Sequence, residues 1–145
     1  MNYPDLDFTL SLLLKGPHSQ EAAALLRELA YSLGLSLVHR LQIENALLRL
    51  LHSGDSTDLI AGREGLRLWR YYFQEQVFMI KSFDLEAALT QATAWNSVCP
   101  VQPPSWALLV HPAIAATAQA TFLSFDPILR KYAAEEGLGL LPATL

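Results

Sequence analysis

The sequence has one cysteine and none of the features of a membrane-spanning or exported protein. That cysteine, Cys99, excludes an internal disulfide and a zinc site built on several cysteines. No apolar run reaches the roughly 18 residues that a membrane-spanning helix needs. The first five residues, Met1-Asn2-Tyr3-Pro4-Asp5, lack the basic region and cleavage site of a signal peptide. We therefore expect a cytoplasmic protein with no membrane contact.

Charged residues are also scarce, at 17% of the 145 residues, and the formal net charge is −4. This charge argues against strong non-specific binding of nucleic acid by the whole surface. It leaves open a local site whose charge is inverted by a bound metal ion. Hydrophobic residues make up 52% of the sequence, which excludes general disorder. A chain of this length and composition can bury a real core, so we expect residues 1–145 to form a single domain.

Strand and helix patterns alternate along the chain. Short apolar runs between turn residues predict strands, and apolar residues spaced by three and four predict helices. Strands are expected at about 3–6, 35–38, 77–80, 122–125 and 138–141, and helices at about 8–14, 19–33, 40–52, 59–73, 85–96, 106–118 and 127–136. Such alternation is typical of a parallel sheet covered on both faces. We therefore predict an α/β fold with three layers, α/β/α, around a central, mainly parallel sheet.

The sequence also predicts one helix end and one buried helix face. Gly34 is expected to end the second helix, because glycine is common just past a helix end. In the fourth helix, Leu59, Leu66 and Phe73 recur every seven residues and are expected to face the core.

The sixth predicted helix is almost wholly apolar, which only a helix buried on most sides tolerates. Ser105 stands at its start and is expected to cap it. His111 is its one titratable group. The favoured interpretation of His111 is a hydrogen-bonded core histidine, ahead of a metal ligand or a base.

Acidic side chains stand at the carboxyl ends of two predicted strands. Asp5 belongs to the end of the first strand, and Asp126 follows the apolar run that contains Phe122 and Phe125. Ligands of open α/β sheets bind at this end of the strands. Asp126 is equally well placed to cap the helix that opens with Pro127. The sequence leaves both interpretations of Asp126 open.

Glu44 is a third acidic candidate. It precedes Leu47 and Leu48 by three and four residues, so in a helix it shares their face. A carboxylate on an apolar face needs a partner, a proton or a cation. The alternative is that Glu44 lies at the edge of this face and pairs with Arg40 or Arg49.

Three carboxylates brought together cannot all ionise without a cation. A group made of Asp5, Glu44 and Asp126 implies a hard, oxygen-loving ion such as Mg²⁺ or Mn²⁺. Such an ion activates water and binds phosphate oxygens, which favours phosphodiester hydrolysis. No phosphate-binding loop, dinucleotide fingerprint, nucleophile elbow or metalloprotease motif points elsewhere.

A basic stripe runs along the fourth predicted helix. Arg63, Arg67 and Arg70 recur at i, i+4 and i+7, beside the aromatic residues Trp69, Tyr71 and Tyr72. Basic and aromatic side chains together can hold single-stranded nucleic acid through phosphate contacts and stacking. A solvated helix face with its aromatic residues in the core is the alternative, and the pattern favours it.

Three stretches of the chain resemble the PIN-domain family of metal-dependent ribonucleases, which includes the VapC-type toxins of bacterial toxin–antitoxin pairs. They are Tyr3-Pro4-Asp5-Leu6-Asp7-Phe8, His39-Arg40-Leu41-Gln42-Ile43-Glu44-Asn45-Ala46-Leu47, and Phe122-Leu123-Ser124-Phe125-Asp126 with Ala133-Ala134-Glu135-Glu136-Gly137-Leu138. The resemblance spans nearly the whole chain, and the closing stretch is the most specific. It implies that Asp5, Glu44 and Asp126 surround a Mg or Mn ion, with Ser124 close to the site.

The resemblance implies an RNA substrate and an antitoxin partner, and we also expect a homodimer. The sequence also departs from the family pattern, and two of the departures concern acidic residues of the site. The family has a further aspartate where this chain has Ala107, and Asp7 stands where the family usually has Ser, Thr or Asn, as a possible accessory ligand. The leading hypothesis is therefore a toxin-like, metal-dependent ribonuclease. The alternative, favoured by Ala107, is a PIN domain without catalysis that serves as a binding or regulatory module.

Overall fold

The computed structural model describes residues 1–30, 32–98, 102 and 104–145. In this part of the chain the elements are β1 (Asn2–Pro4), α1 (Leu6–Leu13), α2 (Ser19–Glu28), β2 (Leu33–Leu35), α3 (Leu37–Leu51), α4 (Ser56–Gln74), β3 (Phe78–Ile80), α5 (Leu85–Val98), α6 (Trp106–Thr117), β4 (Thr121–Leu123), α7 (Pro127–Glu135) and β5 (Leu140–Leu141). Cys99, on which the exclusion of disulfides rests, lies outside the described residues.

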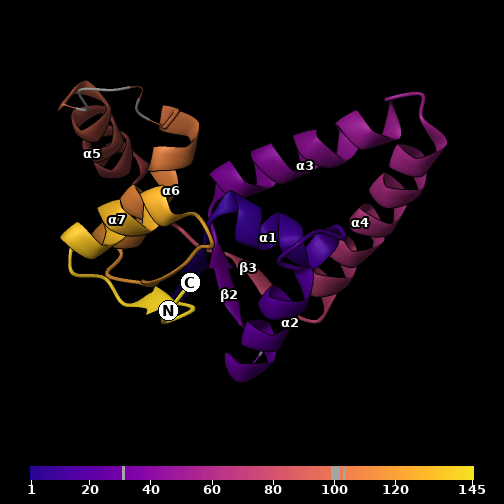
Figure 1. The fold of residues 1–145 in the computed structure, drawn as a ribbon, viewed down its shortest axis with the longest axis horizontal. Helices are drawn as coiled ribbons and strands as arrows, with labels where there is room; N and C mark the ends of the chain where they lie inside the picture. The colour runs from indigo at the N-terminus through magenta and orange to yellow at the C-terminus, as the bar shows by residue number, and fades with distance from the viewer. Residues whose placement is uncertain (31, 99–101, 103) are drawn as a thin grey trace. The chain divides into compact units, whose positions relative to one another are not determined.

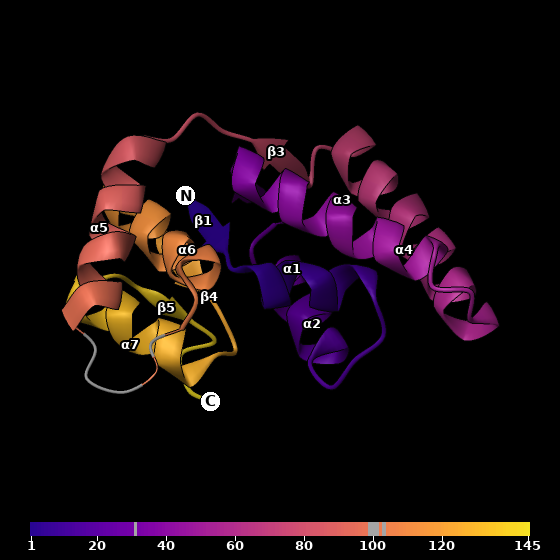
Figure 2. The ribbon, with the colours of Figure 1, turned by 90° about the horizontal axis from the view of Figure 1, so that it is seen from above.

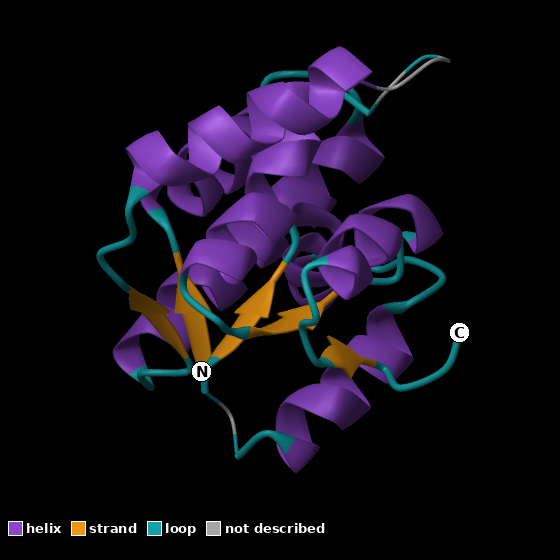
Figure 3. Ribbon diagram, turned by 90° about the vertical axis from the view of Figure 1, so that its left-hand side faces the viewer, coloured by secondary structure: helices purple, strands orange, loops and turns teal. Residues whose placement is uncertain are grey.

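The chain divides into two compact units, which we describe separately. Unit 1 consists of Met1–Asp5 and Ser82–Leu145, and unit 2 of Leu6–Lys81. Unit 2 is therefore an insertion, in sequence, between the first strand of unit 1 and the rest of it. Figure 3 shows the strands of both units as short orange arrows among the purple helices.

Unit 1 is built on a three-stranded sheet in the order β1-β4-β5. Both pairings are parallel, with Tyr3 opposite Phe122 in the first and Phe122 opposite Leu140 in the second. Helix α6 packs on β4, α7 packs on β5, and α5 covers α6. The indigo β1 strand therefore belongs with the orange and yellow elements (Figure 2), although it stands at the other end of the sequence.

Large apolar side chains with no exposed surface form the core of unit 1, among them Tyr3, Phe122 and Ile114. The Tyr3 hydroxyl lies 3.1 Å from Nδ1 of His111, which is also fully buried on α6. His111 is thus a hydrogen-bonded core histidine, as the favoured interpretation of the sequence has it.

Unit 2 has a two-stranded parallel sheet, β2 with β3, in which Leu33 lies opposite Phe78. Its longest helices, α3 and α4, pack on each other as an antiparallel pair (Figure 1), and α1 contacts both. The rings of Trp69, Tyr72 and Phe73 on α4 gather around Phe78 of β3, with centroids 4.9–5.9 Å from its ring. This aromatic cluster joins the end of α4 to the small sheet.

The boundary predictions around Gly34 are wrong. Helix α2 ends at Glu28, and Gly34 lies fully within the buried strand β2. Helix α3 starts at Leu37 because Ser36 caps it: the Ser36 hydroxyl accepts the His39 amide at 3.4 Å, and His39 Nδ1 accepts the Ser36 amide at 3.2 Å. This reciprocal pair, in which histidine takes the place of the usual Glu or Gln, satisfies backbone donors at the helix start. Residues predicted as a strand therefore begin a helix.

The apolar residues predicted to face inward on α4 make up only part of its inner face. Leu59, Leu66 and Phe73 are half-buried, Leu66 and Phe73 line the groove beside α3, and the fully buried residues of this helix are Gly62, Gly65 and Trp69. A Cβ atom at Gly65 would lie 2.7 Å from Cδ2 of Leu47 on α3. The inner face is marked by glycines because α4 approaches α3 closely there, a contact that an apolar periodicity does not reveal.

The predicted α/β class is confirmed, and every strand pairing in the described residues is parallel. The sheet predicted as one central layer consists of a three-stranded and a two-stranded part in this region. The prediction of one domain over residues 1–145 stays a prediction. None of the helices in the described ranges combines the length and the apolar composition needed to cross a membrane.

Candidate functional site

The carboxyl ends of β1 and β4 bring Asp5 and Ser124 together. The strands are parallel and in register, and the Asp5 amide continues the ladder by donating to the Leu123 carbonyl at 2.8 Å. The Ser124 hydroxyl donates a short hydrogen bond to Oδ2 of Asp5. Asp5 is 1% exposed and Ser124 is fully buried. A buried carboxylate needs such a donor, and here the fold supplies one from the neighbouring strand.

Asp126 joins the same group through the backbone of the turn that follows β4. Its amide donates to the Ser124 hydroxyl at 3.0 Å. Its Oδ1 caps α7 by accepting the amides of Ile128 at 2.7 Å and Leu129 at 3.2 Å. Its Oδ2 makes no hydrogen bond to any residue that the structure describes, and the side chain is half-exposed. The capping interpretation is therefore right, and it leaves one carboxylate oxygen for a ligand.

Arg130, which the sequence analysis missed, lies next to this group. The residue is 8% exposed, and its guanidinium donates to two backbone carbonyls, from Nη1 to Ser124 at 2.9 Å and from Nη2 to Pro142 at 2.7 Å. Burial lowers the pKa of Arg130 from its usual value, although an arginine remains charged. A signal was available: Arg130 follows Asp126 by four residues and precedes the buried Ala133 by three, which places all three on one helix face.

The start of α6 lacks the acidic residue that the family resemblance led us to look for. Ala107 occupies the second position of the helix and is half-buried. Ser105 is the N-cap residue, but its side chain makes no capping hydrogen bond, so the predicted cap is wrong. Ala107 brings no carboxylate to unit 1, which leaves Asp5 and Asp126 as its two predicted ligands.

Glu44 and Asp7 belong to unit 2. Oε1 of Glu44 lies 3.0 Å from Nε of Arg40, and the two side chains are 41% and 58% exposed. The surface pairing with Arg40, one of the alternatives that the sequence left open, is thus what the structure contains. Asp7 is exposed in the first turn of α1. The roles of Glu44 as a ligand and of Asp7 as an accessory residue stay predictions.

The structure therefore brings together Asp5, Ser124 and Asp126, all within unit 1. Across the described ranges, no three His, Cys, Asp or Glu side chains lie close enough together to form a metal-binding group. The two carboxylates of unit 1 offer hard oxygen donors, the kind that Mg²⁺ and Mn²⁺ prefer. The chemistry of these donors fits the predicted ion.

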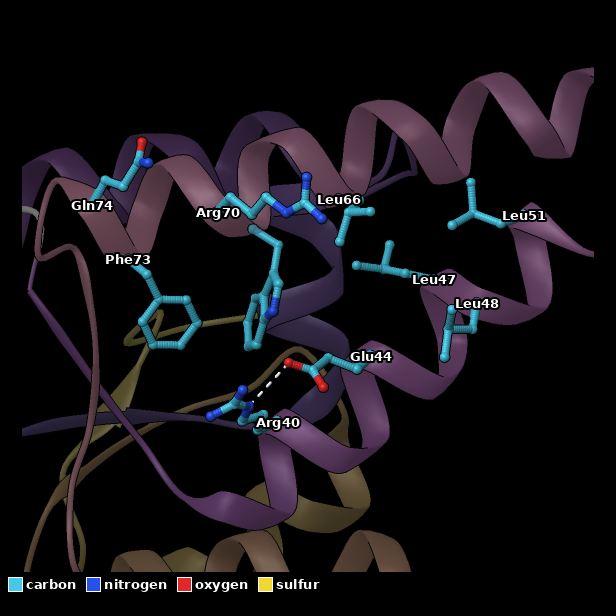
Figure 4. Close-up of a pocket in the computed structure, with 10 residues that line it drawn as sticks. Arg40, Glu44, Leu47, Leu48, Leu51, Leu66, Arg70, Phe73 and Gln74 are labelled. Carbon is cyan, nitrogen blue, oxygen red and sulfur yellow. Dashed lines mark hydrogen bonds and ion pairs between the residues drawn. The ribbon is translucent and has the colours of Figure 1, made fainter.

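Unit 2 contains a groove of about 590 Å³ between α3 and α4. Figure 4 shows its leucine side chains, from Leu47 and Leu48 on α3 and Leu66 on α4, pointing into the space between the helices. Polar residues stand around it, with the Arg40–Glu44 pair on the α3 side. An open apolar surface with a charged edge is suited to a protein segment that is apolar on one face.

The predicted basic stripe lies on the exposed side of α4. Arg63, Arg67 and Arg70 are all exposed and border one shallow depression together with Tyr71. Arg67 is engaged with Glu64 through two hydrogen bonds of 2.7 and 2.9 Å. These bonds hold the pKa of Glu64 below its usual value and raise that of Arg67. The stripe is solvated, as the favoured alternative has it, and its role in binding RNA stays a prediction.

Comparison with solved structures extends over nearly the whole chain. FitAcB from Neisseria gonorrhoeae is similar with a TM-score of 0.64 and 13% identity, over 99% of this chain and 98% of that one. The chain is also similar to VapBC2 from Rickettsia felis, with a TM-score of 0.64 and 14% identity over 97% of each chain. That structure was solved bound to a DNA fragment from the promoter of VapBC2. No family model and no curated protein matches the sequence. At these identities the likeness establishes the fold alone, and it agrees with the predicted α/β fold.

Proposed function

We propose that this protein is a metal-dependent ribonuclease of the toxin kind, which hydrolyses phosphodiester bonds of RNA. One observation carries the proposal: a single serine ties Asp5 to the turn of Asp126 at the carboxyl ends of parallel strands. This is the edge at which α/β sheets bind ligands. The resemblance of the sequence to PIN domains and the likeness to the two solved structures support it.

Each residue of unit 1 has a separate part in holding the ion. Asp126 would bind through Oδ2 while Oδ1 keeps its bonds to the first turn of α7. Asp5 would bind as a carboxylate whose orientation the Ser124 hydroxyl fixes. A bound Mg²⁺ or Mn²⁺ supplies an activated water and neutralises phosphate charge. Glu44, in unit 2, is proposed as a third ligand from the family resemblance alone.

The loss of an acidic residue at Ala107 is compatible with weak metal binding. Mg²⁺ commonly keeps several waters and takes only one or two carboxylates from the protein, with the rest supplied by substrate phosphates. Asp5 and Asp126 meet this requirement for one ion. We therefore propose one secure metal site and a nuclease of reduced activity.

The proposed partners follow from the same reasoning. Arg63 and Arg70 would hold phosphates of the RNA, whereas Arg67 is already engaged with Glu64. An antitoxin segment with an apolar face would occupy the groove between α3 and α4, because the leucines there form an open apolar surface. A homodimer and a place in the cytoplasm stay predictions.

The test is cleavage of single-stranded RNA with Mn²⁺ by the wild type and by Asp126→Asn from the same purification. We expect the variant to lose at least about 10-fold in rate, the lower end of what loss of a metal-site group costs. In addition, Mn²⁺ should raise the melting temperature of the wild type, because a ligand that binds only the folded state stabilises it. Equal cleavage by both proteins would mean contamination and would end the nuclease proposal.

A second candidate is a binding module without catalysis, favoured by Ala107 and by the pairing of Glu44 with Arg40. Under this alternative the wild type shows no metal-dependent cleavage and still binds RNA or a protein partner. Ala107→Asp separates the two candidates. In a weakened nuclease it should raise Mn²⁺-dependent cleavage above the wild-type rate, whereas in metal-free protein the added half-buried carboxylate should lower stability.

A further inference from the structure

Arg130 is a buried cation for which the described part of the chain supplies no acidic partner. No Asp or Glu in the described residues lies within ion-pair distance of its guanidinium, and its two hydrogen bonds go to backbone carbonyls. Burying a charge costs free energy unless hydrogen bonds and opposite charge compensate it. A neutral apolar side chain would avoid the cost of burying a charge, but it would leave the two carbonyls without these donors. The position of the charge therefore needs an explanation beyond packing.

The two carbonyls belong to different segments of unit 1. Nη1 reaches Ser124, directly after β4, and Nη2 reaches Pro142, directly after β5. Guanidinium is planar and presents its donors in a fixed fork, so it can hold two acceptors at once in one geometry. Because α7 is anchored at Asp126, the fork ties both strand ends to the helix that Asp126 caps.

Ser124 connects Arg130 to the two acidic residues of the candidate site. Its amide donates to Leu141 at 3.1 Å and its carbonyl accepts from Arg130. Its hydroxyl donates to Asp5 and accepts the Asp126 amide. Every polar group of Ser124 is thus engaged, and a shift of its backbone would move the hydroxyl relative to both acidic residues.

We propose that Arg130 is a positioning residue of the metal site. It fixes the backbone of Ser124, and through the Ser124 hydroxyl it sets the relative orientation of Asp5 and Asp126. The inference rests on the proposed function, because it assigns Arg130 to the site that would hold the ion. Groups that orient metal ligands typically contribute about 10- to 100-fold to metal affinity.

The first test measures Mn²⁺ affinity by calorimetric titration of the wild type, Arg130→Gln and Arg130→Lys. Both variants should weaken binding about 10-fold or more, because glutamine loses the charge and lysine keeps the charge but loses the fork. The matched control is Ala92→Gly, in the buried part of α5, which should lower stability by about 1 kcal/mol without touching the strand ends. A purely structural Arg130 would give Arg130→Gln and Ala92→Gly the same Mn²⁺ affinity, and that result would overturn the proposal.

The second test needs no metal, so it separates this inference from the proposed function. Hydrogen exchange of the Asp126 amide reports its bond to the Ser124 hydroxyl. Exchange there should be faster in Arg130→Lys than in Ala92→Gly, after each is corrected for global stability. Equal exchange would overturn the role of Arg130. A wild type that binds no Mn²⁺ would count against the proposed function, and the exchange comparison would then decide the role of Arg130 alone.

Discussion

Charged residues considered for the candidate site differ in exposure between the two units. In unit 1, Asp5 and Arg130 are 1% and 8% exposed, and each is fixed by hydrogen bonds to Ser124. In unit 2, Arg40 pairs with Glu44 one turn along α3, and both side chains are well exposed. Buried groups are costly to leave unpaired, whereas exposed ion pairs contribute little and rearrange easily. Of the two acidic motif residues, Asp5 is therefore buried and oriented by a hydrogen bond, whereas Glu44 is exposed in a surface pair.

The units also differ in how they pack. Unit 1 surrounds a three-stranded sheet with large side chains, of which Phe122 at the centre has no exposed surface. Unit 2 relies on the close approach of α3 and α4 at Gly65 and leaves a groove beside it. Unit 1 should therefore be sensitive to loss of volume, and unit 2 to added volume.

The largest effect should come from Phe122→Ala. Removing this ring from the central strand β4 should cost about 3–5 kcal/mol in the free energy of unfolding, through lost burial and the cavity left behind. Urea denaturation measures it. The control is Ile128→Ala on α7, which is 54% exposed and should cost well under about 1 kcal/mol. Similar losses for both would mean that the sheet of unit 1 is not its core.

Gly65→Leu should have the next largest effect. The added side chain would overlap Leu47 and Leu14, whose Cδ2 atoms lie 2.7 and 2.9 Å from the position of a Cβ atom. Overpacking of this kind typically costs about 1–3 kcal/mol. Gly16→Leu is the matched control, because no atom lies within 4 Å of a Cβ at Gly16. If the two variants have the same melting temperature, α3 and α4 do not pack closely in solution.

The sequence predicted the class of the fold because alternation of strands and helices depends on local spacing. It also located Asp5 and Asp126 at strand ends, and the structure joins them through Ser124. It was wrong at Gly34, since a glycine within a buried strand and one that ends a helix look the same in sequence. It made no prediction for Gly65, where the lack of a side chain permits α4 to approach α3 closely.

Local spacing placed Arg130 on the helix face of Asp126 and Ala133, but it could not reveal the hydrogen bonds that Arg130 makes. Its partners are a carbonyl six residues before it and one twelve residues after it. Carbonyl groups belong to every residue, so a side chain that binds them leaves no complementary residue type in the sequence. Glu44 is the opposite case. Its partner Arg40 was visible four residues away, and the sequence could not decide between a surface pair and a ligand.

Glycine substitutions just past two helix ends should have a smaller effect on stability, and they should raise it. Gln119 after α6 and Gln76 after α4 both have positive φ, of 50° and 57°. A non-glycine residue in the left-handed conformation destabilises the folded state by about 1–2 kcal/mol. Glycine avoids this strain, but ordering its more flexible backbone on folding costs about 0.5–1 kcal/mol. Gln119→Gly and Gln76→Gly should each therefore stabilise the protein by about 0.5–1 kcal/mol in thermal unfolding. Gly137→Ala, after α7 with φ of 73°, should do the reverse.

The smallest effect on stability should come from the Arg40–Glu44 pair. A double-mutant cycle with Arg40→Ala and Glu44→Gln should give a coupling energy of about 0.3–0.5 kcal/mol at low salt, since exposed pairs on one helix face contribute no more. The coupling should fall further at high salt, because exposed charges are screened. A coupling above about 1 kcal/mol would show that this pair is more buried in solution than its exposure indicates.

Glu44→Gln also tests whether the exposed carboxylate of unit 2 takes part in metal binding. A carboxylate held only by an exposed pair can leave Arg40 at little cost, so Glu44 can serve as a ligand despite its present partner. If it does, Glu44→Gln should weaken Mn²⁺ binding while the metal-free melting temperature stays within the range of a surface substitution. Arg40→Ala should leave Mn²⁺ affinity unchanged or raise it slightly, because it releases the carboxylate. If Glu44→Gln binds Mn²⁺ as tightly as the wild type while Asp126→Asn does not, the metal site consists of unit 1 residues alone, and the predicted role of Glu44 is wrong.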